Sequence, residues 1–177
     1  LRPEQPTDVL QEALALLKNE FENRRITVSV DITEAIPAVQ LDRSQIKQVF
    51  FNLIKNALEA MPDGGALRIE MGAGDVYVDI AFIDTGKGIA PEELQRVFEP
   101  YHTTKQTGSG LGLMIVQRII DEHGGEIELS SKPGAGTCFK VRLPRFERRV
   151  RLLTTPAPAE NNGPRRSFEG TPEAVIG

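Results

Sequence analysis

The stretch Asp84-Thr85-Gly86-Lys87-Gly88-Ile89 decides the fold, together with a second glycine-rich turn about twenty residues later, Gly108-Ser109-Gly110-Leu111-Gly112-Leu113. The apolar run 76–83 before Asp84 predicts a buried strand that ends in a carboxylate. Glycines let a backbone approach a ligand closely, and a carboxylate can accept a hydrogen bond from a buried amine. Either turn alone is more often an ordinary hairpin or helix entry. In this order the two turns predict a nucleotide site beneath a lid.

The second turn runs into the apolar segment 111–120, which predicts a helix. The N-terminus of a helix presents unpaired amides and the positive end of the helix dipole, which suits a phosphate. No Gly-Lys-Ser/Thr follows either turn, and the glycines at 108, 110 and 112 are spaced G-x-G-x-G. The sequence therefore argues against a P-loop and against a dinucleotide-binding turn.

Upstream, the segment 41–61 predicts a third part of the site on a helix, capped by Asp42 or Ser44 and ended by Pro62. A broad apolar face is formed by Ile46, Val49, Phe50, Leu53, Ala57 and Met61. Beside it, Asn52 and Asn56 lie one turn apart, although Asn lowers helix propensity and a solvated face usually carries Lys and Glu. An Asn carbonyl can serve as a protein ligand of Mg²⁺ whose other ligands are water and phosphate. A plain polar surface is the alternative.

These motifs together resemble the boxes of the ATP-binding catalytic domain of two-component sensor histidine kinases, which belong to the GHKL ATPase superfamily. The N box matches residues 52–57, the first G box 84–88, the F box 98–105, the second G box 108–113 and the third G box 134–137. All five occur in order, and the resemblance covers about residues 8–144.

The resemblance implies an α+β fold of the Bergerat type, a two-layer α/β sandwich in which a mixed five-stranded sheet is covered on one face by three helices. An ATP lid is expected over 85–109. We expect helices at 8–25, 44–61, 91–97 and 110–123, and strands at 26–32, 38–41, 66–71, 75–83, 125–131 and 136–143. Residues 1–7 are interpreted as a junction to a missing dimerisation and phosphoacceptor hairpin, residues 8–144 as the catalytic domain, and residues 145–177 as a disordered tail.

The resemblance also implies roles for particular residues. Asp84 would bind the adenine amine, Asn56 would hold Mg²⁺, and Asn52 would lie near the phosphates. The base pocket would be lined by Gly86, Gly88 and Ile89 and bordered by Leu113 and Thr137. Lys105, with Thr104 beside it, would reach the terminal phosphates, which would be cradled by Gly108, Gly110, Leu111 and Gly112. Asn52, Asn56 and Lys105 are the predicted catalytic residues, and ATP and Mg²⁺ the predicted cofactors.

The phosphoacceptor histidine of such kinases is followed at once by an acidic residue, but His102 precedes Thr103 and His123 precedes Gly124. The fragment is therefore expected to bind ATP without phosphorylating itself, and His123 to have a structural or capping role. Hydrolytic relatives carry a glutamate base where this chain has Asn52, and an amide cannot take a proton from water. Rapid ATP hydrolysis is not expected.

Composition fits one globular domain, with 40% hydrophobic and 26% charged residues. The net charge of −4 argues against a nucleic-acid partner, and no apolar run approaches the roughly 18 residues of a membrane span. The single cysteine, Cys138, excludes an internal disulfide and suits a cytoplasmic location. No membrane contact is expected for this fragment, although the full-length protein could carry an anchor.

The partners implied are a histidine phosphoacceptor and dimerisation domain of the same protein, within a homodimer, and a response regulator. Two alternatives stay open: a GHKL serine/threonine kinase of the anti-sigma type, and a non-catalytic module that binds ATP to change its contacts with a partner. The glycines on both sides of the lid predict that it is mobile without nucleotide.

Overall fold

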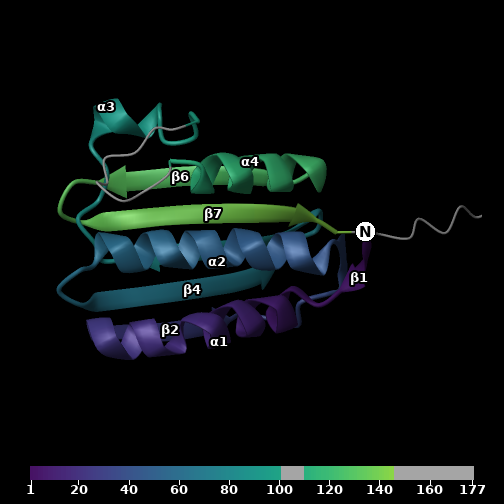
Figure 1. The fold of residues 1–177 in the computed structure, drawn as a ribbon. Helices are drawn as coiled ribbons and strands as arrows, with labels where there is room; N and C mark the ends of the chain where they lie inside the picture. The colour runs from purple at the N-terminus through teal and green to yellow at the C-terminus, as the bar shows by residue number, and fades with distance from the viewer. Residues whose placement is uncertain (101–109, 146–177) are drawn as a thin grey trace, which may run out of the picture. The chain divides into compact units, whose positions relative to one another are not determined.

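Five strands form one mixed sheet in the order β2–β4–β5–β7–β6, in a computed structural model that describes residues 1–100 and 110–145 (Figure 1). The strands are β2 (Ile26–Ile32), β4 (Gly65–Ala73), β5 (Tyr77–Asp84), β6 (Glu126–Lys132) and β7 (Gly136–Pro144). β2 runs parallel to β4, and the other three pairings are antiparallel. The mixed five-stranded sheet predicted from the sequence is confirmed.

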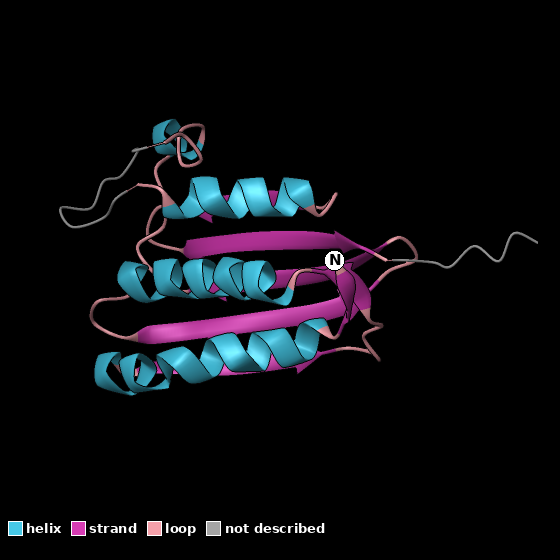
Figure 2. Cartoon of the chain, turned by 45° about the vertical axis from the view of Figure 1, so that its right-hand side comes forward, coloured by secondary structure: helices cyan, strands magenta, loops and turns pink. Residues whose placement is uncertain are grey.

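Three helices cover one face of this sheet, α1 (Pro6–Arg24), α2 (Arg43–Ala60) and α4 (Gly112–Glu122), and no helix of the described residues covers the other face (Figure 2). α2 lies over the middle of the sheet and packs against α1 and α4. Strands β4 and β5 alternate buried and more exposed residues, so that Ile69, Ile80 and Phe82 enter the core. This two-layer α+β arrangement agrees with the expected sandwich.

Local signals at both ends of α2 explain its length. Asp42 is its N-cap, and the side-chain Oδ1 accepts a hydrogen bond from the Gln45 amide at 3.0 Å. The helix ends at Ala60, shortly before Pro62, which favours a break. Its buried residues include the predicted apolar face from Ile46 to Ala57 and also Ile54 and Leu58, and the C-cap Met61 is buried as well. α2 is therefore the central support of the core.

A small second sheet was not predicted from the sequence. β1 (Arg2–Glu4) pairs antiparallel with β3 (Val39–Leu41). Glu4 then forms an ion pair with Arg43, the first residue of α2, at 2.7 Å. Three residues are too few for a detectable alternation. Both β1 and α1 begin before residue 8. The predicted domain boundary at that residue stays a prediction.

The short helix α3 (Pro91–Leu94) is shorter than the predicted 91–97. Beyond it, the Arg96 backbone amide donates to the Glu93 carbonyl and the Glu99 backbone amide to the Arg96 carbonyl, both at 2.9 Å. Bonds of this i to i+3 kind form turns and do not continue an α-helix. No helix in the described part of the chain has the length and apolar character needed to cross a bilayer.

Candidate functional site

Asp84 lies at the last position of β5, directly opposite Thr137 near the start of β7. Its side chain is buried, and Oδ1 accepts hydrogen bonds from the Gly86 amide at 2.8 Å and the Thr137 amide at 3.3 Å. No described residue donates to the other oxygen, Oδ2. The carboxylate is thus fixed by one oxygen, and the second is available to a donor on a ligand.

Burial raises the pKa of the Asp84 carboxyl above its usual range, and the amides of Gly86 and Thr137 partly oppose that rise. These two amides are dipoles, and the described salt bridges do not include Asp84. A buried carboxylate without a cationic partner is costly, so its presence at a strand end is typical of a functional site.

Glycines bring the turn after β5 close to its neighbours. A Cβ on Gly86 would lie 2.7 Å from the Ala60 carbonyl oxygen at the end of α2. At Gly136, φ is +91° and a Cβ would collide with the Asp84 carbonyl oxygen. The Lys87 amide also donates to the Ala60 carbonyl at 3.1 Å. The end of α2, the turn after Asp84 and the start of β7 are therefore locked together.

The predicted phosphate side of the site is formed by α2 and the start of α4. Asn52 Nδ2 faces the Gly112 carbonyl at 3.4 Å, a long hydrogen bond, and Asn56 follows one turn later on the same helix. Both Asn side chains are half-buried. Gly110, with φ of +66°, and Leu111 lead into α4, and no side chain of the described residues caps this helix end. Its first amides can therefore face an anion.

Several predicted site residues are brought together and others are not described. Asp84, Gly86 and Thr137 are joined by hydrogen bonds, while Gly88 packs on the Lys132 carbonyl and Leu113 packs against the core. Phe98, the first residue of the predicted F box, also packs against the core. Thr104, Lys105 and Gly108 lie outside the described residues, as do residues 101–109 of the predicted lid as a whole. Their roles and the lid mobility stay predictions.

Ser131 in β6 was missed by the sequence analysis. Its Oγ accepts from the Ile89 amide at 2.8 Å, donates to the Gly136 carbonyl at 2.9 Å and lies 3.0 Å from Thr137 Oγ1. It therefore touches two predicted site residues. The sequence pattern that could have pointed to Ser131 is the alternation of side chains along a strand. It places Ser131 on the same face as the partly buried Ile127 and Leu129.

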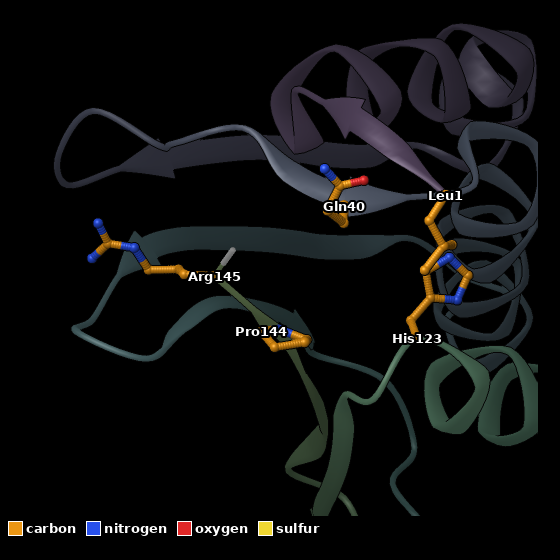
Figure 3. A pocket seen from close by; sticks show the side chains of 5 residues that line it. All are labelled: Leu1, Gln40, His123, Pro144 and Arg145. Carbon is orange, nitrogen blue, oxygen red and sulfur yellow. The ribbon is translucent and has the colours of Figure 1, made fainter. Parts of the chain in front are cut away.

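A cavity of about 490 Å³ lies elsewhere in the domain, lined by Leu1, Gln40, His123, Pro144 and Arg145 (Figure 3). Pro144 pairs with Tyr77, at the opposite end of the β5–β7 ladder from the Asp84–Thr137 pair. His123 is buried here, with Nδ1 2.7 Å from the Ile119 carbonyl and Nε2 3.0 Å from the Asp42 amide. A carbonyl only accepts and an amide only donates, so Nδ1 carries the proton. His123 has the structural role expected from the sequence.

A comparison with protein families decides the identity. The model of the histidine kinase-, DNA gyrase B- and HSP90-like ATPases matches residues 41–147, which span the N-box helix, both glycine turns and β7. The chain belongs to this ATPase family. The resemblance stated from the five sequence boxes is thereby confirmed, and ATP binding is the property that the family name implies.

Proteins similar to this chain include a sporulation kinase and a sensor histidine kinase. Sporulation kinase E of Bacillus subtilis is 40% identical over 139 residues, 78% of this chain and 19% of that protein. The sensor histidine kinase ZraS of Salmonella typhimurium is 38% identical over 142 residues, 80% of this chain and 30% of that protein. The chain thus spans less than a third of the length of these relatives.

Solved structures with a similar fold also come from a histidine kinase. The nucleotide-free catalytic domain of histidine kinase ThkA has a TM-score of 0.75 and 30% identity, covering 81% of this chain and 95% of that one. ThkA in complex with response regulator protein TrrA has a TM-score of 0.71 and 26% identity, covering 81% of this chain and 41% of that one. The fold of this chain is that of a histidine kinase catalytic domain.

Proposed function

We propose that this chain is the ATP-binding catalytic domain of a sensor histidine kinase, which binds Mg²⁺-ATP and donates the γ-phosphate to a histidine on a separate dimerisation domain. The Asp84 carboxylate carries the proposal. It is buried, held through Oδ1 by two amides, and open at Oδ2 to a donor. The exocyclic amine of adenine is such a donor, and Gly86, Gly88 and Ile89 would form the turn around the base.

The phosphates are proposed to lie at the start of α4, against the amides around Gly110, Leu111 and Gly112. Asn52 supports this position, because it faces the Gly112 carbonyl across the gap between α2 and α4. Lys105 and Thr104, outside the described residues, are proposed to reach the terminal phosphates.

Mg²⁺ is proposed to bind the Asn56 carbonyl. Among the described residues there is no group of three or more His, Cys, Asp or Glu side chains that could hold a metal alone. A single amide oxygen fits an ion that takes most of its ligands from water and phosphate. When bound, Mg²⁺ neutralises phosphate charge and orients the terminal phosphate.

The acceptor histidine is proposed to lie on another domain. Both ring nitrogens of His123 are already hydrogen-bonded, so it offers no nucleophile, and His102 lies outside the described residues. Asn52 cannot act as a base toward water, so ATP should be stable when bound to this chain alone. The base would then come from the domain that carries the acceptor.

A response regulator is the proposed final phosphate acceptor. The complex of ThkA with response regulator protein TrrA supports this assignment, since the ThkA catalytic domain has the same fold. The dimerisation domain, and a homodimer of the full-length protein, are proposed from the resemblance and from the greater length of the relatives.

The test is calorimetric titration of the chain with ATP and ADP, with and without Mg²⁺. Asp84→Asn should lower ADP affinity about 100-fold, because a buried hydrogen bond to a charged group contributes about 1.5–3 kcal/mol and the Asn Nδ2 would face the amine. Asn56→Ala should remove the dependence of ATP affinity on Mg²⁺ and leave ADP binding without Mg²⁺ nearly unchanged.

Asp79→Asn is the matched control, since Asp79 lies on the same strand but pairs with Lys140 and Arg142 on the open face. It should bind nucleotide like the wild type. A folded wild type that binds no nucleotide, or equal losses for the two Asp variants, would refute the assignment of Asp84.

Adding a histidine-containing hairpin in trans, with ATP labelled at the γ-phosphate, tests the transfer. The proposal expects an acid-labile phosphohistidine on the hairpin. Labelling of a serine or threonine would favour the anti-sigma type of kinase. Binding of ATP without transfer to hairpins from homologous kinases would favour a non-catalytic module.

A further inference from the structure

Ser131 is the described side chain that joins the three segments around Asp84 through a single atom. Its Oγ contacts the Ile89 amide in the turn after β5, the Gly136 carbonyl and the Thr137 hydroxyl at the start of β7, while Ser131 itself lies in β6. The neighbouring Ser130 is exposed on the opposite face of the same strand. Ser131 therefore has a position that the rest of β6 does not share.

Counting donors and acceptors fixes the direction of each hydrogen bond. A serine hydroxyl has one proton and two lone pairs. The Gly136 carbonyl can only accept, so it takes the Ser131 proton at 2.9 Å, and the Ile89 amide can only donate, so it uses one lone pair at 2.8 Å. The second lone pair then receives the proton of the Thr137 hydroxyl at 3.0 Å.

The Thr137 hydroxyl has then used its only proton, so it can only accept a hydrogen bond from a ligand in the proposed nucleotide site. It is buried and lies directly across the β5–β7 ladder from Asp84, so the two side chains share a sheet face at about 5 Å between Cβ atoms. Asp84 Oδ2 is an acceptor as well, because an ionised carboxylate has no proton to donate. The end of the ladder presents two acceptors side by side.

We propose that Ser131 is a positioning residue that sets the Thr137 hydroxyl as an acceptor, so that this pocket selects a purine with an amine at its six-position over one with a carbonyl. The inference rests on the proposed function, in which Asp84 binds the base of ATP. An amine brings two donors to the two acceptors. A carbonyl oxygen would face acceptor lone pairs and leave them unpaired, which is the kind of mismatch that discriminates strongly between ligands.

The test compares ADP with inosine diphosphate, which carries a carbonyl oxygen where ADP carries the amine. In Ser131→Ala the Thr137 hydroxyl is free to rotate and donate. The ADP-to-inosine-diphosphate affinity ratio, measured by calorimetry on the full chain, should then fall about fivefold to tenfold, the equivalent of one hydrogen bond. Ser131→Thr keeps the hydroxyl and should restore the ratio, and Ser130→Ala should leave it at the wild-type value.

A double-mutant cycle with Thr137→Val tests the route of the effect. If Ser131 acts through Thr137, adding Ser131→Ala to Thr137→Val should not lower the ratio further. Loss of affinity for both nucleotides by the same factor in Ser131→Ala, or a ratio equal to the wild type, would overturn the inference while leaving ADP binding and the proposed function intact. A folded wild type that binds neither nucleotide would overturn both. Melting temperatures of each variant identify any that do not fold.

Discussion

Asp84 and His123 are both buried polar side chains, with 5% and 6% of their surface exposed, yet their surroundings differ. His123 uses both ring nitrogens, one on the Ile119 carbonyl and one on the Asp42 amide. Asp84 has one oxygen held by two amides and the other open to a ligand. A buried group whose partners are complete supports structure, whereas one whose partners are incomplete identifies a site. The β5–β7 ladder carries the site at one end and the structural histidine near the other.

The largest expected effect comes from a substitution that disturbs the backbone at the Asp84 end of the β5–β7 ladder. Gly136→Ala would push a Cβ into the Asp84 carbonyl oxygen at a φ of +91°. We expect a loss of more than about 3 kcal/mol in the free energy of unfolding, measured by urea denaturation. Gly134→Ala is the matched control, because Gly134 has a φ of +75° but open space around its Cβ position. It should lose only about 1 kcal/mol. Equal losses in the two variants would mean that the close approach to Asp84 is unimportant.

At the other end, His123→Ala should lower the free energy of unfolding by about 2–3 kcal/mol, since the buried Ile119 carbonyl and Asp42 amide lose their partner and a cavity is left. Affinity for ADP should stay within about twofold of the wild type, because this end carries no proposed ligand contact. Chemical denaturation and calorimetry on the same samples measure both quantities. A large fall in ADP affinity with unchanged stability would reverse the roles assigned to the two ends.

A smaller effect is expected at Asp42, which connects His123 to α2. Asp42→Ala removes the cap of the Gln45 amide and should cost about 1 kcal/mol, measured by thermal unfolding, without changing nucleotide affinity. Asp42→Asn keeps a capping oxygen and should be nearly neutral. If both variants lose stability equally, then the capping bond is not the cause.

The smallest expected effect is a gain in the stability of the Asp84→Asn variant at neutral pH. The pKa of Asp84 is raised in the folded protein, chiefly by burial, so the folded state favours the protonated carboxyl more than the unfolded state does. The stability contributed by Asp84 is then fully present below its unfolded pKa, about 4, and is lost as the pH rises through the raised folded pKa. Asp84→Asn carries no charge at any pH. At pH 7 its melting temperature should equal or exceed that of the wild type, and the difference should shrink as the pH falls toward 4.

A variant that is clearly less stable than the wild type at pH 7 would contradict this sign. Such a result would mean that the two amides stabilise the carboxylate more than burial destabilises it. Asp84→Asn should thus weaken nucleotide binding and keep the fold stable. His123→Ala should lower the stability of the fold and keep nucleotide binding.

Much of the fold could be predicted from the sequence because the signals were local. Alternation and glycine turns located the strands of the main sheet, and Asp42 and Pro62 located the ends of α2. Strand β1 could not be predicted, because three residues are too few to show an alternation and its partner β3 follows only after the whole of α1 and β2. The extent of α3 was wrong because sequence does not distinguish a helical turn from a run of i to i+3 turns.

The candidate site divides in the same way. Asp84 and Gly86 could be found because a carboxylate and glycines follow a strand in a short motif. Ser131 could not, since its role depends on the register that sets β6 beside β7 and on the turn after β5 reaching back to it. The contact of His123 with the Asp42 amide joins residues 81 positions apart, and no local pattern reports it.

The pairing of Asp84 with Thr137 also bears on how such a domain can change during evolution. The two residues are 53 positions apart, and the chain between them, which includes α4 and β6, returns to the same end of the β5–β7 ladder. The entropy of closing a loop grows only with the logarithm of its length, by about 0.6 kcal/mol for each doubling. An insertion in a loop between these two strands should therefore change the surroundings of the proposed nucleotide site at little thermodynamic cost to the sheet.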